Sequence, residues 1–150
     1  MDHPLTLEHA FDIRIDFDMR EEYGPLPSGG VGGFTRVGSG TVSGPRLNGT
    51  LVPQGGADWA TIRPDGVIDL DANYMIEADD GTLIHIRNSG YLVRGEPGPD
   101  GRPGQPKYFR ITPVFRTPSG PHDWLSRTIV VGYGVRHWDP DHTVFHYFTV

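Results

Sequence analysis

The sequence contains no cysteine, so disulfide bonds, thiolate metal ligands and a cysteine nucleophile are excluded. It also lacks a run of about 20 apolar residues, the length that a membrane-spanning helix needs. Its N-terminus lacks the basic and apolar segments of a secretion signal. No basic run or stripe stands out among 13 basic and 19 acidic residues, which is unlike a nucleic-acid-binding domain. We therefore expect a soluble cytoplasmic protein that binds neither nucleic acid nor a membrane.

Helical periodicity is lacking as well. No segment repeats apolar residues at the three- and four-residue spacing of an amphipathic helix, and only a helical turn or two is expected, near residues 121–126. Apolar and polar residues alternate instead, as they do in strands with one buried face. Strands are predicted over residues 5–17, 34–42, 47–52, 67–78, 82–91, 107–116, 125–136 and 143–150.

Turn-forming residues are abundant, with 21 glycines and 14 prolines among 150 residues. Turns separate the predicted strands about every eight to twelve residues, which is typical of an all-β sandwich or barrel. Because consecutive hairpins need no long crossovers, we predict one domain over residues 1–150, an antiparallel up-and-down β-barrel of about eight to nine strands. Such a barrel holds its own side chains or one small ligand. Loops are expected over residues 18–33 and 94–106, the second exposed and rich in proline and glycine.

The glycine-rich stretch after Pro53 combines unusual residue types. Proline cannot donate to a sheet ladder, so a strand ends there. Gly55 and Gly56 then permit backbone dihedrals that other residues avoid, and Asp58 and Trp59 follow at once. One interpretation is a loop that points Asp58 and Trp59 at the mouth of a cavity. The alternative is a turn in which Trp59 fills the core and Asp58 hydrogen-bonds the backbone.

Ionisable and aromatic side chains on these strands supply a candidate site. A general acid or base needs a carboxyl or imidazole group whose pKa a dry pocket can shift towards neutrality. Aromatic walls and an arginine suit an apolar ligand with an anionic group. Alternatively, the acids and arginines pair at strand ends while the tryptophans fill the core. The predicted catalytic residues are Asp58, Glu77 and His85, and the predicted ligand contacts are Trp59, Arg63, Asp71, Tyr74, Arg110 and Trp124.

The strand over residues 67–78 can be oriented in two ways. Its apolar side, which includes Leu70 and Tyr74, faces an ordinary core if its acidic side faces water. In a ligand-holding barrel the reverse is allowed, with the acidic side inside and the apolar side packed against a partner subunit. Both orientations stay open from the sequence.

Histidines do not predict a metal site. On one strand His142 and His146 share a face, but they lie about 13 Å apart at ~3.3 Å per residue, too far for one ion. His137 can meet His142 only if the intervening turn folds back. His9 falls on the apolar side of the first strand. No metal ion and no cofactor is expected.

A series of motifs is shared in order with one protein family. The motifs are Gly49-Thr50-Leu51-Val52-Pro53-Gln54-Gly55-Gly56-Ala57-Asp58-Trp59, Arg63-Pro64-Asp65-Gly66, Asp71-Ala72-Asn73-Tyr74, Asp79-Asp80-Gly81, Tyr108-Phe109-Arg110, Phe115-Arg116-Thr117 and Trp124-Leu125-Ser126-Arg127. With these the chain resembles the family called domain of unknown function 3237, or uncharacterised protein family 0311. The resemblance implies a small antiparallel β-barrel of lipocalin-like shape. Barrels of this shape bind apolar small molecules, and some act as cyclases or isomerases in secondary metabolism.

Two classes of function follow. The first is an enzyme that acts on a small apolar or aromatic molecule by acid–base catalysis without a cofactor, as an isomerase, cyclase or lyase. The second is a non-catalytic carrier or sensor of such a molecule. An ionisable residue with a shifted pKa deep in the lumen favours the enzyme. A purely apolar lumen favours the carrier.

A homodimer is also expected. Small barrels with aromatic and β-branched outer strands often cover one apolar face in a two-fold contact. Residues 125–135 and 145–150 are the segments predicted to form it.

Overall fold

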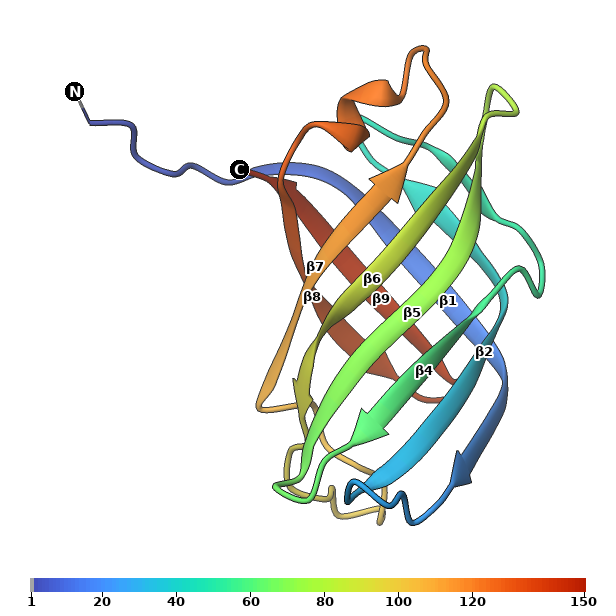
Figure 1. Cartoon of the computed structure of the whole chain (residues 1–150), viewed down its shortest axis with the longest axis vertical. Coiled ribbons are helices and arrows are strands. Elements are labelled where there is room, and N and C mark those ends of the chain that lie inside the picture. The colour runs from blue at the N-terminus through green and yellow to red at the C-terminus, as the bar shows by residue number, and fades with distance from the viewer. Residues whose placement is uncertain (1) are drawn as a thin grey trace.

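The computed structural model describes residues 2–150 and is built almost entirely from β-strands (Figure 1). Its only helical element, within those residues, is a short 3-10 helix, η1. The elements are β1 (Glu8–Tyr23), β2 (Val31–Ser43), β3 (Gly49–Leu51), β4 (Ala57–Ile62), β5 (Val67–Ala78), β6 (Leu83–Val93), β7 (Tyr108–Arg116), η1 (Asp123–Ser126), β8 (Val130–His137) and β9 (His142–Thr149).

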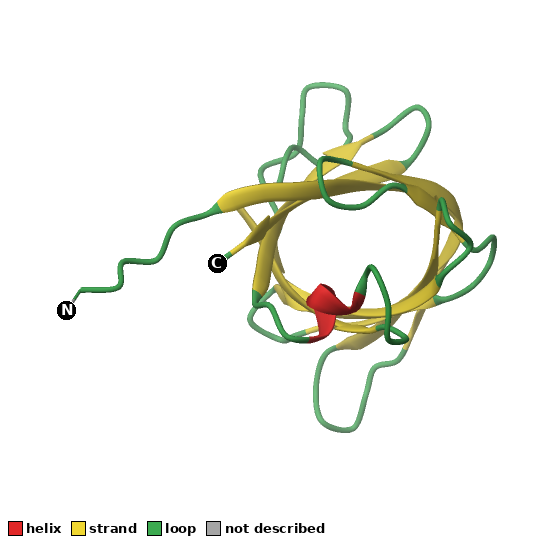
Figure 2. Cartoon of the chain, turned by 90° about the horizontal axis from the view of Figure 1, so that it is seen from above, coloured by secondary structure: helices red, strands yellow, loops and turns green. Residues whose placement is uncertain are grey.

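The strands form a closed antiparallel barrel. From β5 to β9 each strand pairs with the next, and β1 pairs with both β2 and β9, which closes the ring (Figure 2). The short strands β3 and β4 both lie between β2 and β5, one after the other, so nine strands fill eight positions. This confirms the predicted all-β, up-and-down architecture.

The loop predicted over residues 18–33 is wrong for most of its length. β1 continues to Tyr23, and β2 already begins at Val31. Beyond a register irregularity next to Phe17 the two strands stay paired. Met19 lies opposite Arg36 at the start of this stretch, and Tyr23 lies opposite Gly32 at its end. The irregularity interrupts the alternation of side chains, so the pattern of this segment does not predict a strand. Only a tight turn remains between the two strands.

The loop predicted to carry Asp58 and Trp59 is also a strand. Both residues lie in β4, where they pair with Thr35 and Phe34 of β2. The preceding glycines serve close packing: a Cβ at Gly56 would lie 1.9 Å from the carbonyl oxygen of Asn73. The chain therefore passes directly over β5 between β3 and β4.

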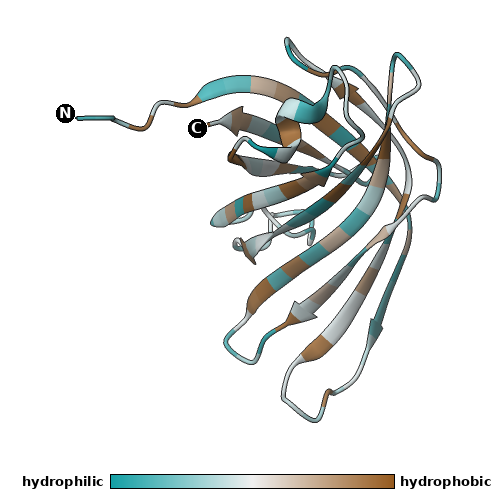
Figure 3. Cartoon of the chain, turned by 45° about the horizontal axis from the view of Figure 1, so that its top comes forward, coloured by the Kyte–Doolittle hydropathy of each residue, from teal (hydrophilic) through white to brown (hydrophobic). Residues whose placement is uncertain are grey.

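Side chains alternate between the lumen and the outer surface, as the banded hydropathy of the strands in Figure 3 shows. On β5 the apolar side, including Leu70 and Tyr74, faces the lumen, whereas Asp71 lies on the outer side and pairs with Arg87 of β6. The sequence left this orientation open. The reverse arrangement, with the acidic side inside, is contradicted.

The two ends of the barrel differ. At the end that carries the chain termini, η1 lies across part of the opening, and Leu125 is buried among apolar side chains (Figures 1 and 2). Phe11 fills the interior there, with its ring centroid 6.0 Å from that of Phe115 and 5.1 Å from that of Tyr147. Apolar side chains therefore fill this end of the lumen, and a cavity lies toward the opposite end.

Among residues 2–150 no helix has the length and apolar character of a membrane span.

Candidate functional site

A cavity of about 280 Å³ occupies the lumen at the end away from η1. The β1–β2, β4–β5, β6–β7 and β8–β9 connections lie at this end of the barrel (Figure 1). Its wall is mainly aliphatic and aromatic, with Ile15, Phe17, Leu70, Leu92, Phe109 and Phe145 among the lining residues. Such a surface suits an apolar ligand.

Polar groups lie at the floor of this cavity. Tyr74 of β5 and Asn88 of β6 both line it and are almost completely buried, and Tyr147 lies beside them in the core. The Tyr74 and Tyr147 hydroxyls lie near each other, but neither of them, nor the Asn88 Oδ1, has a partner with hydrogen-bond geometry among residues 2–150. An unpaired buried polar atom costs about 1–3 kcal/mol, so the Tyr74 and Asn88 atoms, which line the cavity, are ready to bind a polar group.

The two tyrosines remain protonated. Burial raises the pKa of Tyr74 well above its ordinary value; the neighbouring Tyr147 hydroxyl partly offsets this effect, and the nearby negative charge of Asp58 adds to it. Burial also raises the pKa of Tyr147, and the neighbouring Tyr74 adds to the effect. The Tyr74 hydroxyl, which lines the cavity, can therefore donate a hydrogen bond to an oxygen atom there.

Asp58 supplies the ionisable group of the cavity. Its side chain points into the lumen from β4, and its Oδ1 accepts a hydrogen bond of 2.9 Å from the backbone N–H of Asp71. Desolvation by burial raises the pKa of Asp58 to about 6, and the nearby charge of Asp71 acts in the same direction, although the hydrogen bond from the Asp71 N–H and the charge of Arg20 oppose it. A carboxyl group with this pKa exchanges protons readily near neutral pH.

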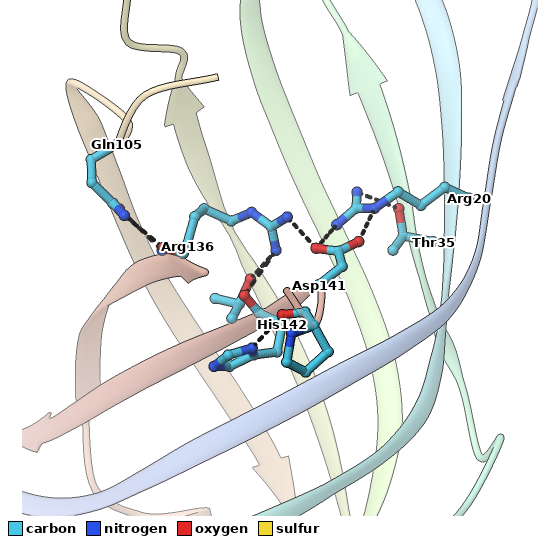
Figure 4. A network of polar contacts seen from close by, with 8 residues as sticks. Arg20, Thr35, Gln105, Arg136, Asp141 and His142 are labelled. Atoms are coloured by element: carbon cyan, nitrogen blue, oxygen red, sulfur yellow. Dashed lines mark hydrogen bonds and ion pairs between the residues drawn. The ribbon is translucent and has the colours of Figure 1, made fainter. Parts of the chain in front are cut away.

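A charged cluster forms part of the cavity rim (Figure 4). Arg20 of β1 and Arg136 of β8 both point at Asp141, which accepts from Arg20 Nε at 2.8 Å and from Arg136 Nη2. Arg136 also donates to the Thr143 hydroxyl at 2.7 Å, and Arg20 donates to the Thr35 hydroxyl at 3.4 Å. The cluster links β1, β2, β8 and β9 at the open end.

Charges within this rim cluster shift one another's pKa values. Burial lowers the pKa of Arg136, and Asp141 partly offsets that effect. Burial alone would raise the pKa of Asp141, but hydrogen bonds from Arg20 and Arg136 lower it.

A second hollow of about 440 Å³ beside the cavity is bordered by the same two arginines and by Arg94. The entrance therefore carries charges of both signs, because Glu21 and Glu22 also line the cavity beside the arginines.

Of the three residues predicted to be catalytic, the structure brings only Asp58 to the cavity. Glu77 is exposed on the outer side of β5. His85 lies on the outer side of β6, where its Nδ1 is buried and has no partner among residues 2–150. Both are odd-numbered, whereas the even-numbered residues of β5 and β6 face inward, so neither can reach the lumen.

Of the predicted ligand contacts, only Tyr74 lines the cavity. Trp59 is 47% exposed on the outer surface and packs on Phe34 at a centroid distance of 5.8 Å. Trp124 belongs to η1 at the closed end, under the guanidinium of Arg46 at 3.7 Å. The other three also lie outside the lumen: Arg63 pairs with Asp65 and Asp69, Asp71 pairs with Arg87, and Arg110 lies over the rings of Tyr108 and Tyr133.

Several cavity residues were missed from the sequence. Asn88 and Arg136 follow the inward-facing alternation of β6 and β8, so strand parity could have identified them. Arg20 gave no such signal, because the irregularity beyond Phe17 changes which residues of β1 face inward. Of the histidines at the C-terminal end of the chain, His137 and His142 stack at 4.5 Å across the β8–β9 turn, while His146 contacts Asp12.

Comparison with known sequences connects the chain to bacterial proteins. A UPF0311 protein of Rhodopseudomonas palustris is 37% identical over 112 residues, which covers 67% of this chain and 69% of that protein. A UPF0311 protein of Clostridium acetobutylicum is 34% identical over 134 residues, which covers 85% of this chain and 84% of that protein.

Solved structures share the barrel. A protein of unknown function from Clostridium acetobutylicum has a TM-score of 0.84 at 29% identity and covers 99% of both chains. A beta-barrel like protein from Acinetobacter baumannii has a TM-score of 0.84 at 26% identity, with 99% of this chain and 98% of that chain covered. An enzyme from Penicillium herquei has a TM-score of 0.72 at 20% identity over 99% and 98% of the two chains, and this likeness concerns the fold alone.

The family assignment agrees with these likenesses and with the motifs that the sequence carries. The model of the family described as "Protein of unknown function (DUF3237)" matches residues 5–150, which include every strand of the barrel. The chain therefore belongs to the DUF3237 family.

Proposed function

We propose that the lumen binds one small apolar or aromatic molecule with a polar group directed at the floor. The observation that carries this proposal is the pair of unpaired buried polar atoms of Tyr74 and Asn88 beneath a mainly apolar wall. A ligand oxygen placed there would accept from a tyrosine hydroxyl and compensate the cost of burial. The cavity volume of about 280 Å³ lies near the lower end of common ligand pockets, which favours a compact molecule.

We further propose that the protein is a cofactor-independent acid–base enzyme of the isomerase, cyclase or lyase type. Asp58 would take a proton from the bound molecule and return it at another atom. Its pKa of about 6 suits both steps near neutral pH. The hydroxyl of Tyr74 would stabilise negative charge that develops on a substrate oxygen. The Penicillium herquei neighbour is described as an enzyme, so a barrel of this shape can carry catalysis.

Filling the lumen is expected to abolish binding of an aromatic probe. Ala60 lines the cavity from β4, and an indole ring at this position would occupy much of the available volume. We expect the wild-type protein to bind 1-anilinonaphthalene-8-sulfonate saturably, with enhanced fluorescence. The Ala60→Trp variant should bind it more weakly by about tenfold or more, a loss of about 1.4 kcal/mol.

The matched control is Thr61→Trp, because Thr61 follows Ala60 on β4 and faces outward. It adds the same indole ring to the outer surface, so it should leave probe affinity unchanged. Equal affinity of Ala60→Trp and the wild-type protein would place the probe outside the lumen and remove the support for this binding site.

Catalysis is tested with the molecule that copurifies with the protein, identified by native mass spectrometry. Turnover of that molecule by Asp58→Asn should fall roughly a hundredfold or more, because an amide cannot transfer the proton. Its affinity should change far less, since the asparagine side chain keeps an oxygen that accepts from the Asp71 N–H. A molecule that is bound but recovered unchanged by the wild-type protein would instead identify a carrier or sensor.

A further inference from the structure

Three potential metal ligands converge on the outer surface of the barrel, away from the cavity. The His9 Nε2 lies 2.7 Å from the Asp12 Oδ1, and the His146 Nδ1 lies 2.8 Å from the same oxygen. All three ligand atoms lie within 4.8 Å of one another. Two imidazole nitrogens and one carboxylate oxygen thus surround a single point.

The fold brings these residues together through a β-bulge. His9 and Asp12 are three positions apart, so in a regular strand they would face opposite sides. The register shifts between His9 and Phe11, and the successive residues Ala10 and Phe11 are both 0% exposed. The bulge therefore turns His9 outward, onto the same side as Asp12. The expectation that His9 faces the apolar interior is wrong for this reason.

The third residue comes from the other end of the sequence. Asp12 is paired directly with His146 across β1 and β9, although the two are 134 positions apart. Aromatic rings pack against both imidazoles: Phe148 lies 5.5 Å from His9 and Tyr133 lies 4.9 Å from His146, measured between ring centroids. An aromatic ring thus lies beside each imidazole, and a nitrogen atom of each imidazole contacts Asp12.

We propose that His9, Asp12 and His146 form a site for a divalent transition-metal ion of the Zn²⁺ class, a function distinct from ligand binding in the lumen. Two imidazole groups select such ions over Ca²⁺ and Mg²⁺, which prefer oxygen ligands. With metal–ligand bonds of about 2.1 Å, tetrahedral ligands lie about 3.4 Å apart. The observed 2.7 and 2.8 Å separations would have to widen by about 0.6 Å, which side-chain rotation can supply.

Such a site would join the first long strand to the last. The β1–β9 pairing is one of the contacts that close the barrel, and it connects the two ends of the chain (Figure 1). An unfolded chain does not hold His9 and Asp12 near His146, so the ion binds the folded state preferentially and stabilises it. Three protein ligands leave a fourth position that water can fill.

Calorimetric titration with Zn²⁺ tests the site. We expect the chelator-treated wild-type protein to bind one Zn²⁺ per chain with micromolar or tighter affinity, and its melting temperature to rise with Zn²⁺. His9→Ala and His146→Ala should each weaken binding by about tenfold or more and remove the thermal shift, since each deletes one ligand. Replacement of Zn²⁺ by Co²⁺ should give visible absorption bands typical of a four- or five-coordinate ion.

The control variant is His122→Ala. His122 faces a single carboxylate, Asp80, at 2.9 Å, so it reproduces the histidine–aspartate contact without a second imidazole. Zn²⁺ binding by this variant should match that of the wild-type protein. The stacked His137–His142 pair is checked in the same way with His142→Ala.

Three results would overturn the proposal: no saturable binding up to about 100 μM Zn²⁺, wild-type affinity in both His9→Ala and His146→Ala, or loss of binding only in His142→Ala. Circular dichroism confirms the fold of each variant. The His9 side chain is 41% exposed, so the His9→Ala variant should fold. If the His146→Ala variant does not fold, His9→Ala alone decides whether the site binds Zn²⁺.

Discussion

At pH 8 the Asp58→Asn variant is expected to melt on the order of 5–10 °C above the wild-type protein. In the folded protein the pKa of Asp58 is raised from 3.8 to about 6 by burial, so the ionised carboxylate destabilises the fold at this pH. A difference of about two pKa units corresponds to about 3 kcal/mol of free energy of unfolding. Asparagine carries no charge, and its side-chain oxygen still accepts from the Asp71 N–H.

This stabilisation should depend on pH in a defined direction. Between about pH 4 and 6 the folded protein keeps the Asp58 proton while the unfolded chain has lost it, so wild-type stability attributable to Asp58 falls as pH rises. At pH 4 the Asp58→Asn variant and the wild-type protein should therefore unfold at similar urea concentrations, and by pH 8 they should separate fully. An equal difference at pH 4 and pH 8 would show that the Asp58 carboxyl is not shifted.

Asp71→Asn is the matched control for Asp58→Asn. Asp71 is the acidic neighbour across the hydrogen bond, but its side chain is 46% exposed on the outer surface and pairs with Arg87 at 3.1 Å. Removal of such a solvent-exposed pair should change the free energy of unfolding by about 1 kcal/mol or less. A stabilisation at pH 8 specific to Asp58→Asn would assign the effect to charge inside the lumen.

Gly56→Ala is expected to destabilise the protein by about 3 kcal/mol, which lowers the melting temperature on the order of 10 °C. The new Cβ would lie 1.9 Å from the Asn73 carbonyl oxygen and 2.6 Å from the Tyr74 Cα. Both atoms belong to the backbone of β5, which cannot move as a flexible side chain does. The clash should also displace Tyr74 at the cavity floor and weaken binding of the aromatic probe.

The control for this clash is Gly81→Ala, measured by the same thermal and urea unfolding. Gly81 has a φ of +86° in the turn between β5 and β6, and a Cβ there meets no atom within 4 Å. Alanine at this position should cost only about 1 kcal/mol, from backbone conformation. If Gly56→Ala loses no more stability than Gly81→Ala, the close approach of Gly56 to the backbone of β5 is not the reason for glycine at position 56.

Strand β5 shows what could be predicted well. The boundaries predicted from alternation, residues 67–78, coincide with those observed. The same alternation also contains the inward and outward assignment, since side chains of a strand point to opposite faces in turn. Glu77 and Asp71 were nevertheless proposed as site residues for their chemical type, although their parity places them outside with respect to Tyr74.

Asp58 shows what residue type and spacing cannot predict. The sequence identifies a carboxyl group beside a glycine pair, but the same residues fit a turn or a site. Its burial and its shifted pKa arise from β1, β5 and the lumen around it, none of which is local to β4. Desolvation depends on all neighbours in space, so residue type and spacing alone cannot supply it.

The sequence by itself determined most of the strands, their antiparallel order and the barrel class, because alternation and turn chemistry are local properties of the backbone. Strand β4 and the paired ends of β1 and β2 were not among them. Only the tertiary structure decided which ionisable groups meet. The bulge that turns His9 outward, the irregularity that brings Arg20 to the rim and the pairing of Asp12 with His146 all depend on partner strands. Register between distant segments is set by the packing of the whole barrel, which no single stretch of sequence encodes.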